Sequence, residues 1–183
     1  KTEFGLGDKV ALDVDVKNVK TLIVKVFEID TFNYLRATGR EVDASIDLDG
    51  LVATEERTET YPDEPLRRVR RSFEFPGLDH AGVWIVEMIG NGTSSRAVIR
   101  KGSLRYVEHA GAAGQVLRVL DGEGKLAPDA SVLFAGREYR ADERGEIVIP
   151  YSTAPATKPL ILRRGEFATR TTLGDLSRFN AAA

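Results

Sequence analysis

Hydrophobic and polar residues alternate along several short stretches of this chain. Val10, Leu12, Val14 and Val16 alternate with small or charged residues, which is the pattern of a strand with one buried and one solvated face. Residues 21–29 carry apolar side chains on both faces of the expected strand and therefore predict a central strand. No long stretch repeats its apolar residues with the helical period of about 3.6. The pattern predicts an all-β fold.

The strongest local signal is a hairpin at residues 81–99. An apolar run ends at Ile89, and a second strand returns from Ser95. Between them, Asn91 and Gly92 tolerate the positive φ angles that both central positions of a type I′ turn require. With this hairpin the sequence predicts about seven strands in roughly 100 residues, which is typical of an immunoglobulin-like sandwich.

Three segments of the first half have weaker signals. Residues 31–38 lose the alternation and predict a short helical turn before Gly39. Residues 42–48 alternate again and predict a strand, whereas residues 55–66 are acidic, contain two prolines and predict a surface loop. The large side chains expected in the core are Phe27, Phe73, Phe75, Trp84 and Ile85.

The small residues 111–114 suggest a boundary between two domains. We predict two consecutive immunoglobulin-like antiparallel β-sandwich domains, the first over residues 1–108 and the second over residues 109–174, followed by a tail at 175–183. In the second domain, a turn that places Gly145 in the left-handed region is expected to join two strands as a hairpin.

The composition is that of a globular protein, and it argues against some classes of binding partner. The chain has 183 residues, of which 30% are charged, and a formal net charge of −2, which argues against a general nucleic-acid or membrane-surface binder. The absence of cysteine excludes disulfides and thiolate metal sites. Apolar runs are far shorter than the roughly 20 residues that cross a bilayer, so no direct membrane insertion is expected. The start at Lys1 predicts a piece of a longer protein.

Two stretches of the second half resemble known β-sandwich families. Residues 119–132 contain an Asp-Gly turn followed by Pro128 and Val132, and residues 141–150 contain a second turn that ends at Gly145. Their pattern is similar to that of macroglobulin-like domains of the α2-macroglobulin family and of transthyretin-like domains. In the first half, residues 18–28 and 82–87 resemble parts of macroglobulin-like domains, the former as found in bacterial α2-macroglobulin-like proteins.

The resemblance implies a non-catalytic structural or interaction module, a fragment of a larger exported protein that is periplasmic, secreted or at the cell surface. The expected partners are neighbouring domains of the parent protein and other proteins such as proteases, with no nucleic acid and no cofactor. The thioester of an active α2-macroglobulin needs a cysteine, which this chain lacks. We therefore expect no enzymatic activity in this chain.

Asp47, Asp49 and Glu56 form a weak candidate metal site. Their spacing around Gly50 is near that of an EF-hand loop, in which alternating oxygen ligands surround Ca²⁺. The flanking residues, however, alternate as in a strand, and Ser45 stands where the first ligand would be Asp. The favoured interpretation is a strand that runs into an Asp-Gly turn, and a calcium-stabilised adhesion module is the alternative.

Arg67, Arg68, Arg70 and Arg71 form the densest basic run and are a candidate interaction surface. A polyanion site would use such a cluster. The favoured interpretation is a charged strand face that nearby acidic residues neutralise, namely Glu55, Glu56, Glu59, Asp63 and Glu64.

The remaining candidates are two histidines and two tyrosines. His80 and His109 lack convergent partners in the sequence, and we expect His80 to be a solvated turn residue. Tyr34 and Tyr61 lie in less regular segments and are candidate contact residues. If both rings are exposed and coplanar, they favour another alternative function, a carbohydrate-binding module attached to a secreted enzyme.

Overall fold

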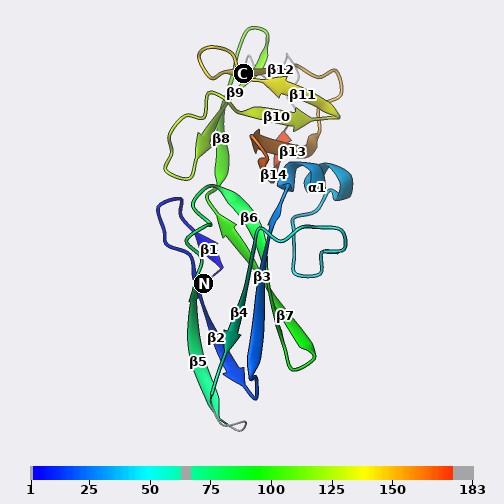
Figure 1. The fold of residues 1–183 in the computed structure, drawn as a ribbon. Coiled ribbons are helices and arrows are strands. Elements are labelled where there is room, and N and C mark those ends of the chain that lie inside the picture. Colours follow the sequence, from blue (N-terminus) through cyan, green and yellow to red (C-terminus); the bar gives the residue numbers. More distant parts are fainter. Residues whose placement is uncertain (1, 63–66, 175–183) are drawn as a thin grey trace. The chain divides into compact units, whose positions relative to one another are not determined.

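The computed structural model describes residues 2–62 and 67–174. In that part, the chain consists almost entirely of strands with one short helix and forms two compact units (Figure 1). Unit 1 contains the residues up to Ile29 together with Val42–Gly102. Unit 2 contains Asp30–Glu41 and the residues from Ser103 onward. The predicted all-β fold is confirmed.

Unit 1 is a sandwich of a five-stranded and a two-stranded sheet. The larger sheet has the order β1–β7–β6–β3–β4, with a parallel β1–β7 pair and otherwise antiparallel neighbours. The smaller sheet is the antiparallel pair β2–β5. The strands are β1 (Glu3–Phe4), β2 (Ala11–Lys17), β3 (Thr21–Ile29), β4 (Glu55–Thr60), β5 (Arg68–Glu74), β6 (Gly82–Gly90) and β7 (Thr93–Lys101).

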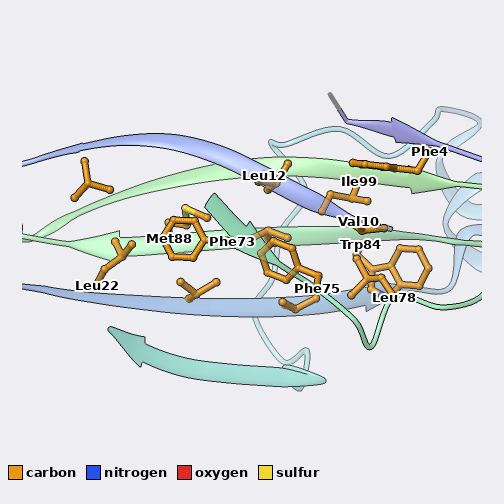
Figure 2. Packing of buried hydrophobic residues seen from close by; sticks show 14 residues of the cluster. Phe4, Val10, Leu12, Leu22, Phe73, Phe75, Leu78, Trp84, Met88 and Ile99 are labelled. Atoms are coloured by element: carbon orange, nitrogen blue, oxygen red, sulfur yellow. The ribbon is translucent and has the colours of Figure 1, made fainter. Parts of the chain in front are cut away.

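The core of unit 1 lies between these two sheets (Figure 2). Trp84 of β6 is 1% exposed and packs in one cluster with Phe73 and Phe75 from the β5 side. Alternate residues of β2 enter the same cluster, as the sequence pattern predicts, because successive side chains of a strand point to opposite faces. Phe27 and Ile85 are also buried, so the five predicted large core residues are confirmed.

The hairpin of β6 and β7 has the predicted turn. The two strands pair from Gly82 opposite Lys101 to Gly90 opposite Thr93. Asn91 has a φ of 50° and Gly92 has a φ of 73°, the two positive angles that define a type I′ connection. The hairpin prediction is confirmed.

The predicted strand at residues 42–48 is wrong. Asp43 accepts a hydrogen bond from the Ser45 N–H at 2.8 Å, and Asp47 accepts one from the Asp49 N–H at 2.9 Å. These aspartate side chains close local turns and so offer the backbone an alternative to a strand ladder. The alternation in this segment therefore does not mark a sheet.

The predicted surface loop at residues 55–66 is wrong over its first half. Residues 55–60 form β4, which pairs with β3 at one edge of the larger sheet. Their side chains alternate between half-buried and exposed, but they are charged residues and threonines, so the apolar signal of a strand is missing. Charged side chains are common on edge strands, where they discourage pairing with other chains. Residues 63–66 lie outside the described residues.

Unit 2 is a second antiparallel sandwich. Its sheets have the orders β11–β10–β13–β14 and β12–β9–β8, and its core lies between them, with Leu117, Val132 and Leu160 completely buried. The strands are β8 (Leu104–Ala110), β9 (Gly114–Asp121), β10 (Ser131–Phe134), β11 (Arg137–Arg140), β12 (Ile147–Pro150), β13 (Thr157–Arg164) and β14 (Phe167–Gly174). The prediction of two immunoglobulin-like sandwiches agrees with this architecture.

The helix α1 (Thr31–Thr38) belongs to unit 2 and matches the predicted helical turn. The Asp30 side chain caps its first turn by accepting a hydrogen bond from the Asn33 N–H at 2.9 Å. Gly39 ends it in the left-handed conformation, with a φ of 66°. No helix formed by the described residues is long and apolar enough to span a membrane.

The apolar face of α1 covers the outer face of the four-stranded sheet. Phe32 and Leu35 pack in one cluster with Ile161 of β13 and Ala168 of β14. Since the other face of β13 contributes to the core, three consecutive apolar residues, 160–162, are all buried. Burial of both faces explains why this strand does not alternate.

Unit 2 starts earlier along the chain than the predicted second domain. The strand β8 pairs with β9 along its whole length, so it lies with unit 2 although the sequence placed its first residues before a boundary at residue 109. The predicted turn at Gly145 forms, with a φ of 74°. Its flanking strands β11 and β12 join different sheets, so the predicted hairpin is wrong. The predicted tail at 175–183 lies outside the described residues.

Truncation of a core leucine in unit 1 tests this packing. Leu22 is 5% exposed and belongs to the core cluster, so Leu22→Ala should lower the free energy of unfolding by about 2–5 kcal/mol. The matched control is Leu51→Ala in the same unit, where the side chain is 44% exposed and a much smaller loss is expected. Urea unfolding followed by circular dichroism measures both; equal losses would contradict the assigned core.

Candidate functional site

One side of the unit 1 sandwich is open between its two sheets. The strand β4 ends the five-stranded sheet and β5 belongs to the two-stranded sheet, and no described strand joins them. Both strands therefore leave one backbone edge unpaired, where further main-chain hydrogen bonds can form. A hollow of about 400 Å³ lies between them, lined by Arg57, Glu59, Tyr61, Arg70, Arg71, Ser72, Phe73 and Glu74. We call it the β4–β5 cleft.

Two arginines that line this cleft lie over aromatic rings, Arg71 over Tyr61 of the cleft and Arg57 over Phe75 of the core. The Arg71 guanidinium carbon is 3.8 Å from the centroid of the Tyr61 ring. The Arg57 guanidinium carbon is 4.9 Å from the centroid of the Phe75 ring, and its Nη2 donates a hydrogen bond to the Glu74 carbonyl at 3.0 Å. A cation over an aromatic face contributes about 0.5–2 kcal/mol, more where water is excluded. These contacts cover the core where no strand does.

The predicted basic run divides between the cleft and the outer face of β5. Arg71 points inward to Tyr61, and Arg70 is exposed but also lines the cleft. Arg68 and Arg67, which lies just before the strand, are exposed and do not line it. Arg70 forms a long ion pair with Asp13 of β2, at 3.8 Å between Nη2 and Oδ2. The partner of Arg70 thus lies on the neighbouring strand β2. Of the acidic residues predicted to neutralise this face, Asp63 and Glu64 lie outside the described residues.

The acidic residues of β4 have partners of their own. Glu56 lies 3.5 Å from Lys25 of β3, and Glu55 lies 3.8 Å from Arg57. These pairs are partly exposed, so each contributes at most about 1 kcal/mol to stability. The β4–β5 side therefore presents an acidic strand beside a basic one.

The two candidate tyrosines lie in different units. Tyr61 follows β4 in unit 1 and is half-buried, with Arg71 over one face of its ring. Tyr34 is a half-buried residue of α1 in unit 2. No single unit carries both rings as a flat platform, which weakens the carbohydrate-binding alternative.

The candidate calcium ligands have local roles. Asp47 is engaged by the Asp49 N–H, and Glu56 is paired with Lys25. In the part of the chain that the structure describes, no three His, Asp or Glu side chains are placed to hold a metal ion. This geometry counts against the calcium-stabilised adhesion module.

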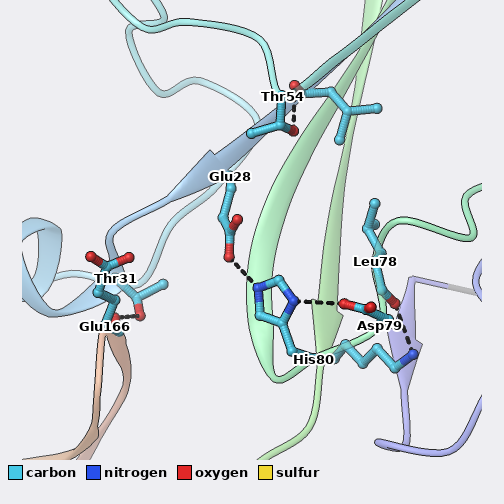
Figure 3. A network of polar contacts seen from close by, with 9 residues as sticks. Glu28, Thr31, Thr54, Leu78, Asp79, His80 and Glu166 are labelled. Carbon is cyan, nitrogen blue, oxygen red and sulfur yellow. Dashed lines mark hydrogen bonds and ion pairs between the residues drawn. The ribbon is translucent and has the colours of Figure 1, made fainter.

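His80 forms a polar cluster that the sequence did not predict (Figure 3). Its Nδ1 lies 2.9 Å from an Asp79 carboxylate oxygen, and its Nε2 lies 2.5 Å from a Glu28 carboxylate oxygen. The ring also meets Trp84 edge-on, with centroids 5.2 Å apart. His80 is about half exposed, as expected of a turn residue, but Glu28 is 52 positions away in sequence, and only the pairing of β3 with β6 brings it near.

The two carboxylates favour the charged form of His80. The hydrogen bond to Asp79, followed by the one to Glu28, raises the pKa of His80 above its ordinary value of 6.5. The hydrogen bond from His80 lowers the pKa of Asp79 below 3.8. Because both ring nitrogens contact carboxylates, neither is free to take a proton from a nucleophile. The cluster therefore does not resemble a catalytic base.

Comparisons with known proteins agree with this architecture. Residues 22–102 match the family model of the AbpF first immunoglobulin-like domain. The chain is 39% identical over 157 residues to Actin-binding protein F of Dictyostelium discoideum, and the match covers 85% of this chain and 7% of that protein. The chain thus spans 7% of the length of the curated relative it matches.

A solved structure of Escherichia coli α2-macroglobulin has a similar fold. The structure that spans its domains MG0-NIE-MG1 has a TM-score of 0.50 at 17% identity, and the match covers 93% of this chain and 63% of that chain. The structure that spans domains NIE-MG1 has a TM-score of 0.44 at 16% identity, with coverage of 89% and 88%. The predicted resemblance to macroglobulin-like domains is confirmed at the level of the fold.

The His80 cluster predicts a pH-dependent contribution to stability. Because the pKa of His80 is raised in the folded state, its stabilisation is fully present below the unfolded value of 6.5 and is lost as pH rises through the folded value. Asp79 acts oppositely, since its lowered pKa contributes stability that is lost only in acid. We expect the free energy of unfolding to fall as pH rises above 6.5.

Urea unfolding at a series of pH values measures this change, and His80→Gln is the variant that removes it. Titration of the imidazole by NMR should give a higher pKa in the folded chain than in the urea-unfolded chain. An identical pH dependence in the wild type and in His80→Gln would contradict the assignment.

Proposed function

We propose that this chain is a non-catalytic interaction module of a large multidomain protein. The support is that residues 22–102 match the family model of the AbpF first immunoglobulin-like domain. The β4–β5 cleft and the exposed arginines of β5 are the proposed protein-binding surface. The observation that carries the proposal is the open side of the unit 1 sandwich, where two unpaired strand edges border a charged hollow. Strand edges and arginine-aromatic clusters are both common elements of protein interfaces.

Actin is the partner we propose for this surface. The support is the name of the relative, Actin-binding protein F, to which 85% of this chain aligns at 39% identity. Since the chain spans 7% of that protein, the actin contact of the relative need not lie in the matched part. The proposal therefore requires a direct binding measurement on this chain.

The expected parent, an exported α2-macroglobulin-like protein, has weaker support. The likeness to the Escherichia coli structure, at 17% identity, is a likeness of fold and says nothing of protease binding. The curated relative comes from Dictyostelium discoideum, so it gives no support to a bacterial source. Location outside the cytoplasm, neighbouring domains and proteases stay as predictions.

Co-sedimentation with filamentous actin tests the proposed partner. The wild-type chain should pellet with filaments, and Arg68→Glu combined with Arg70→Glu should weaken binding about tenfold, equivalent to about 1.4 kcal/mol. The matched control is Arg144→Glu combined with Arg170→Glu, which makes the same charge change at exposed positions of unit 2. A wild-type chain that stays in the supernatant would reject actin, and equal weakening by both pairs would reject the β5 surface.

A further inference from the structure

A lysine is buried at the end of β7 in unit 1. Lys101 is 4% exposed, so its ammonium group is withdrawn from solvent together with its hydrocarbon stem. Lysine stems commonly pack against apolar surface while the charged end reaches water, but here nearly all of the side chain is covered and only a small part of the residue remains accessible. Its Nζ donates a hydrogen bond of 2.8 Å to the Leu78 carbonyl, which is marked in Figure 3.

The same lysine lines a cavity of about 450 Å³ in unit 1. The apolar part of the lining comes from Leu6, Val10, Ala11, Phe75, Pro76 and Leu78. Val10, Phe75 and Leu78 belong to the core shown in Figure 2 and are at most 4% exposed, so the exposed apolar wall of the cavity belongs mainly to Leu6 and Pro76. The volume lies within the range of about 300–1,000 Å³ that is usual for small-molecule sites.

The ammonium group has fewer partners than its charge requires. Lysine carries three N–H donors, and a neutral carbonyl takes one of them. No carboxylate within the described residues forms an ion pair with Nζ at 4.0 Å or less. A buried charge without a close counter-charge costs several kcal/mol, whereas a hydrogen-bonded counter-ion offsets much of that cost.

Three carboxylates line the cavity; Glu74 is exposed, and the other two are engaged elsewhere. Asp8 accepts a hydrogen bond from the Gly5 N–H at 3.0 Å, and Asp79 contacts His80 at 2.9 Å. Lys101 also contributes, as the weakest of several causes, to the lowered pKa of Asp79, which indicates an interaction at longer range. These acidic groups partly compensate the positive charge of Lys101, but they accept no hydrogen bond from its Nζ.

We propose that this cavity binds a carboxylate carried on a short apolar body. The carboxylate would accept hydrogen bonds from Lys101 Nζ, and the apolar body would lie against Leu6 and Pro76. Two sources have this chemistry: a free small carboxylic acid, and the C-terminal residue of a polypeptide with an apolar side chain. The site is confined to unit 1 and does not depend on the proposed binding of actin.

Calorimetric titration of the full chain with three probes tests the site and distinguishes the sources. The probes are an N-acetylated Gly-Gly-Leu peptide with a free carboxylate, the same peptide as its C-terminal amide, and 4-methylpentanoate. We expect one or both carboxylate probes to bind, and the amide to bind about tenfold more weakly or worse. Tight binding of 4-methylpentanoate would identify a free acid as the source, and binding of the peptide acid alone would identify a polypeptide C-terminus.

Two variants and one control locate the binding. Lys101→Met keeps most of the stem, removes the charge and should weaken binding of the carboxylate probe by about tenfold or more. Leu6→Asp places a negative charge beside the cavity at a side chain that is 41% exposed, and it should weaken binding without affecting folding. The control Lys17→Met makes the same substitution at an exposed position of β2 and should bind like the wild type.

Three results would overturn the proposal: no binding of either carboxylate at millimolar concentration, equal binding of peptide acid and amide, or wild-type binding by Lys101→Met. If that variant does not fold, wild-type affinity in folded Leu6→Asp would overturn it instead. None of these outcomes affects the actin measurement, because that measurement uses arginines of β5 that do not line this cavity.

Discussion

The antiparallel register between β3 and β6 is the constraint on which the rest of unit 1 depends. It runs from Leu22 opposite Gly90 to Ile29 opposite Val83, and it directs the alternate residues Val24, Val26 and Trp84 into one core. A slip of one residue would turn all of these side chains to the other face. The same register sets Glu28 opposite Trp84, and thereby beside His80 in the segment that leads into β6. The polar cluster is thus a consequence of how the apolar core packs.

The strand pairings on either side of β3 and β6 position the cavity and the β4–β5 cleft of unit 1. The β6–β7 hairpin fixes Lys101 opposite Gly82, at the end of the sandwich where the Leu78 carbonyl and the cavity lie. On the other side, pairing with β3 makes β4 an edge strand. The two sheets then remain unjoined between β4 and β5, and arginine-aromatic contacts take the place of a strand. A lysine beside an apolar cavity and arginines over aromatic rings are two ways in which this sandwich places cations against its core.

The parts of the fold that follow from local rules could be read from the sequence. Alternation in β2, the two positive φ angles at Asn91 and Gly92, and the helical turn that ends at Gly39 all depend on residues close in the chain. The sequence predictions were wrong where the local pattern of residues was compatible with a different structure. Asp43 and Asp47 close turns in a segment whose sequence alternates as in a strand. The charged residues of β4 form a strand because they pair with the backbone of β3. Of the candidate site residues, Tyr61, Arg70 and Arg71 do lie together, whereas Tyr34 lies in the other unit.

The sequence by itself determined that this chain is built of strands, that it forms two sandwiches, and which large side chains are buried, because these properties depend on residue spacing and hydrophobicity. Only the tertiary structure decided which distant residues meet. It assigned α1 to unit 2 through Phe32 and Leu35, set Glu28 against His80, and buried Lys101 beside a cavity. The physical reason is that strand partners are chosen by the packing of whole sheets, and the positions of polar side chains between strands follow from that choice.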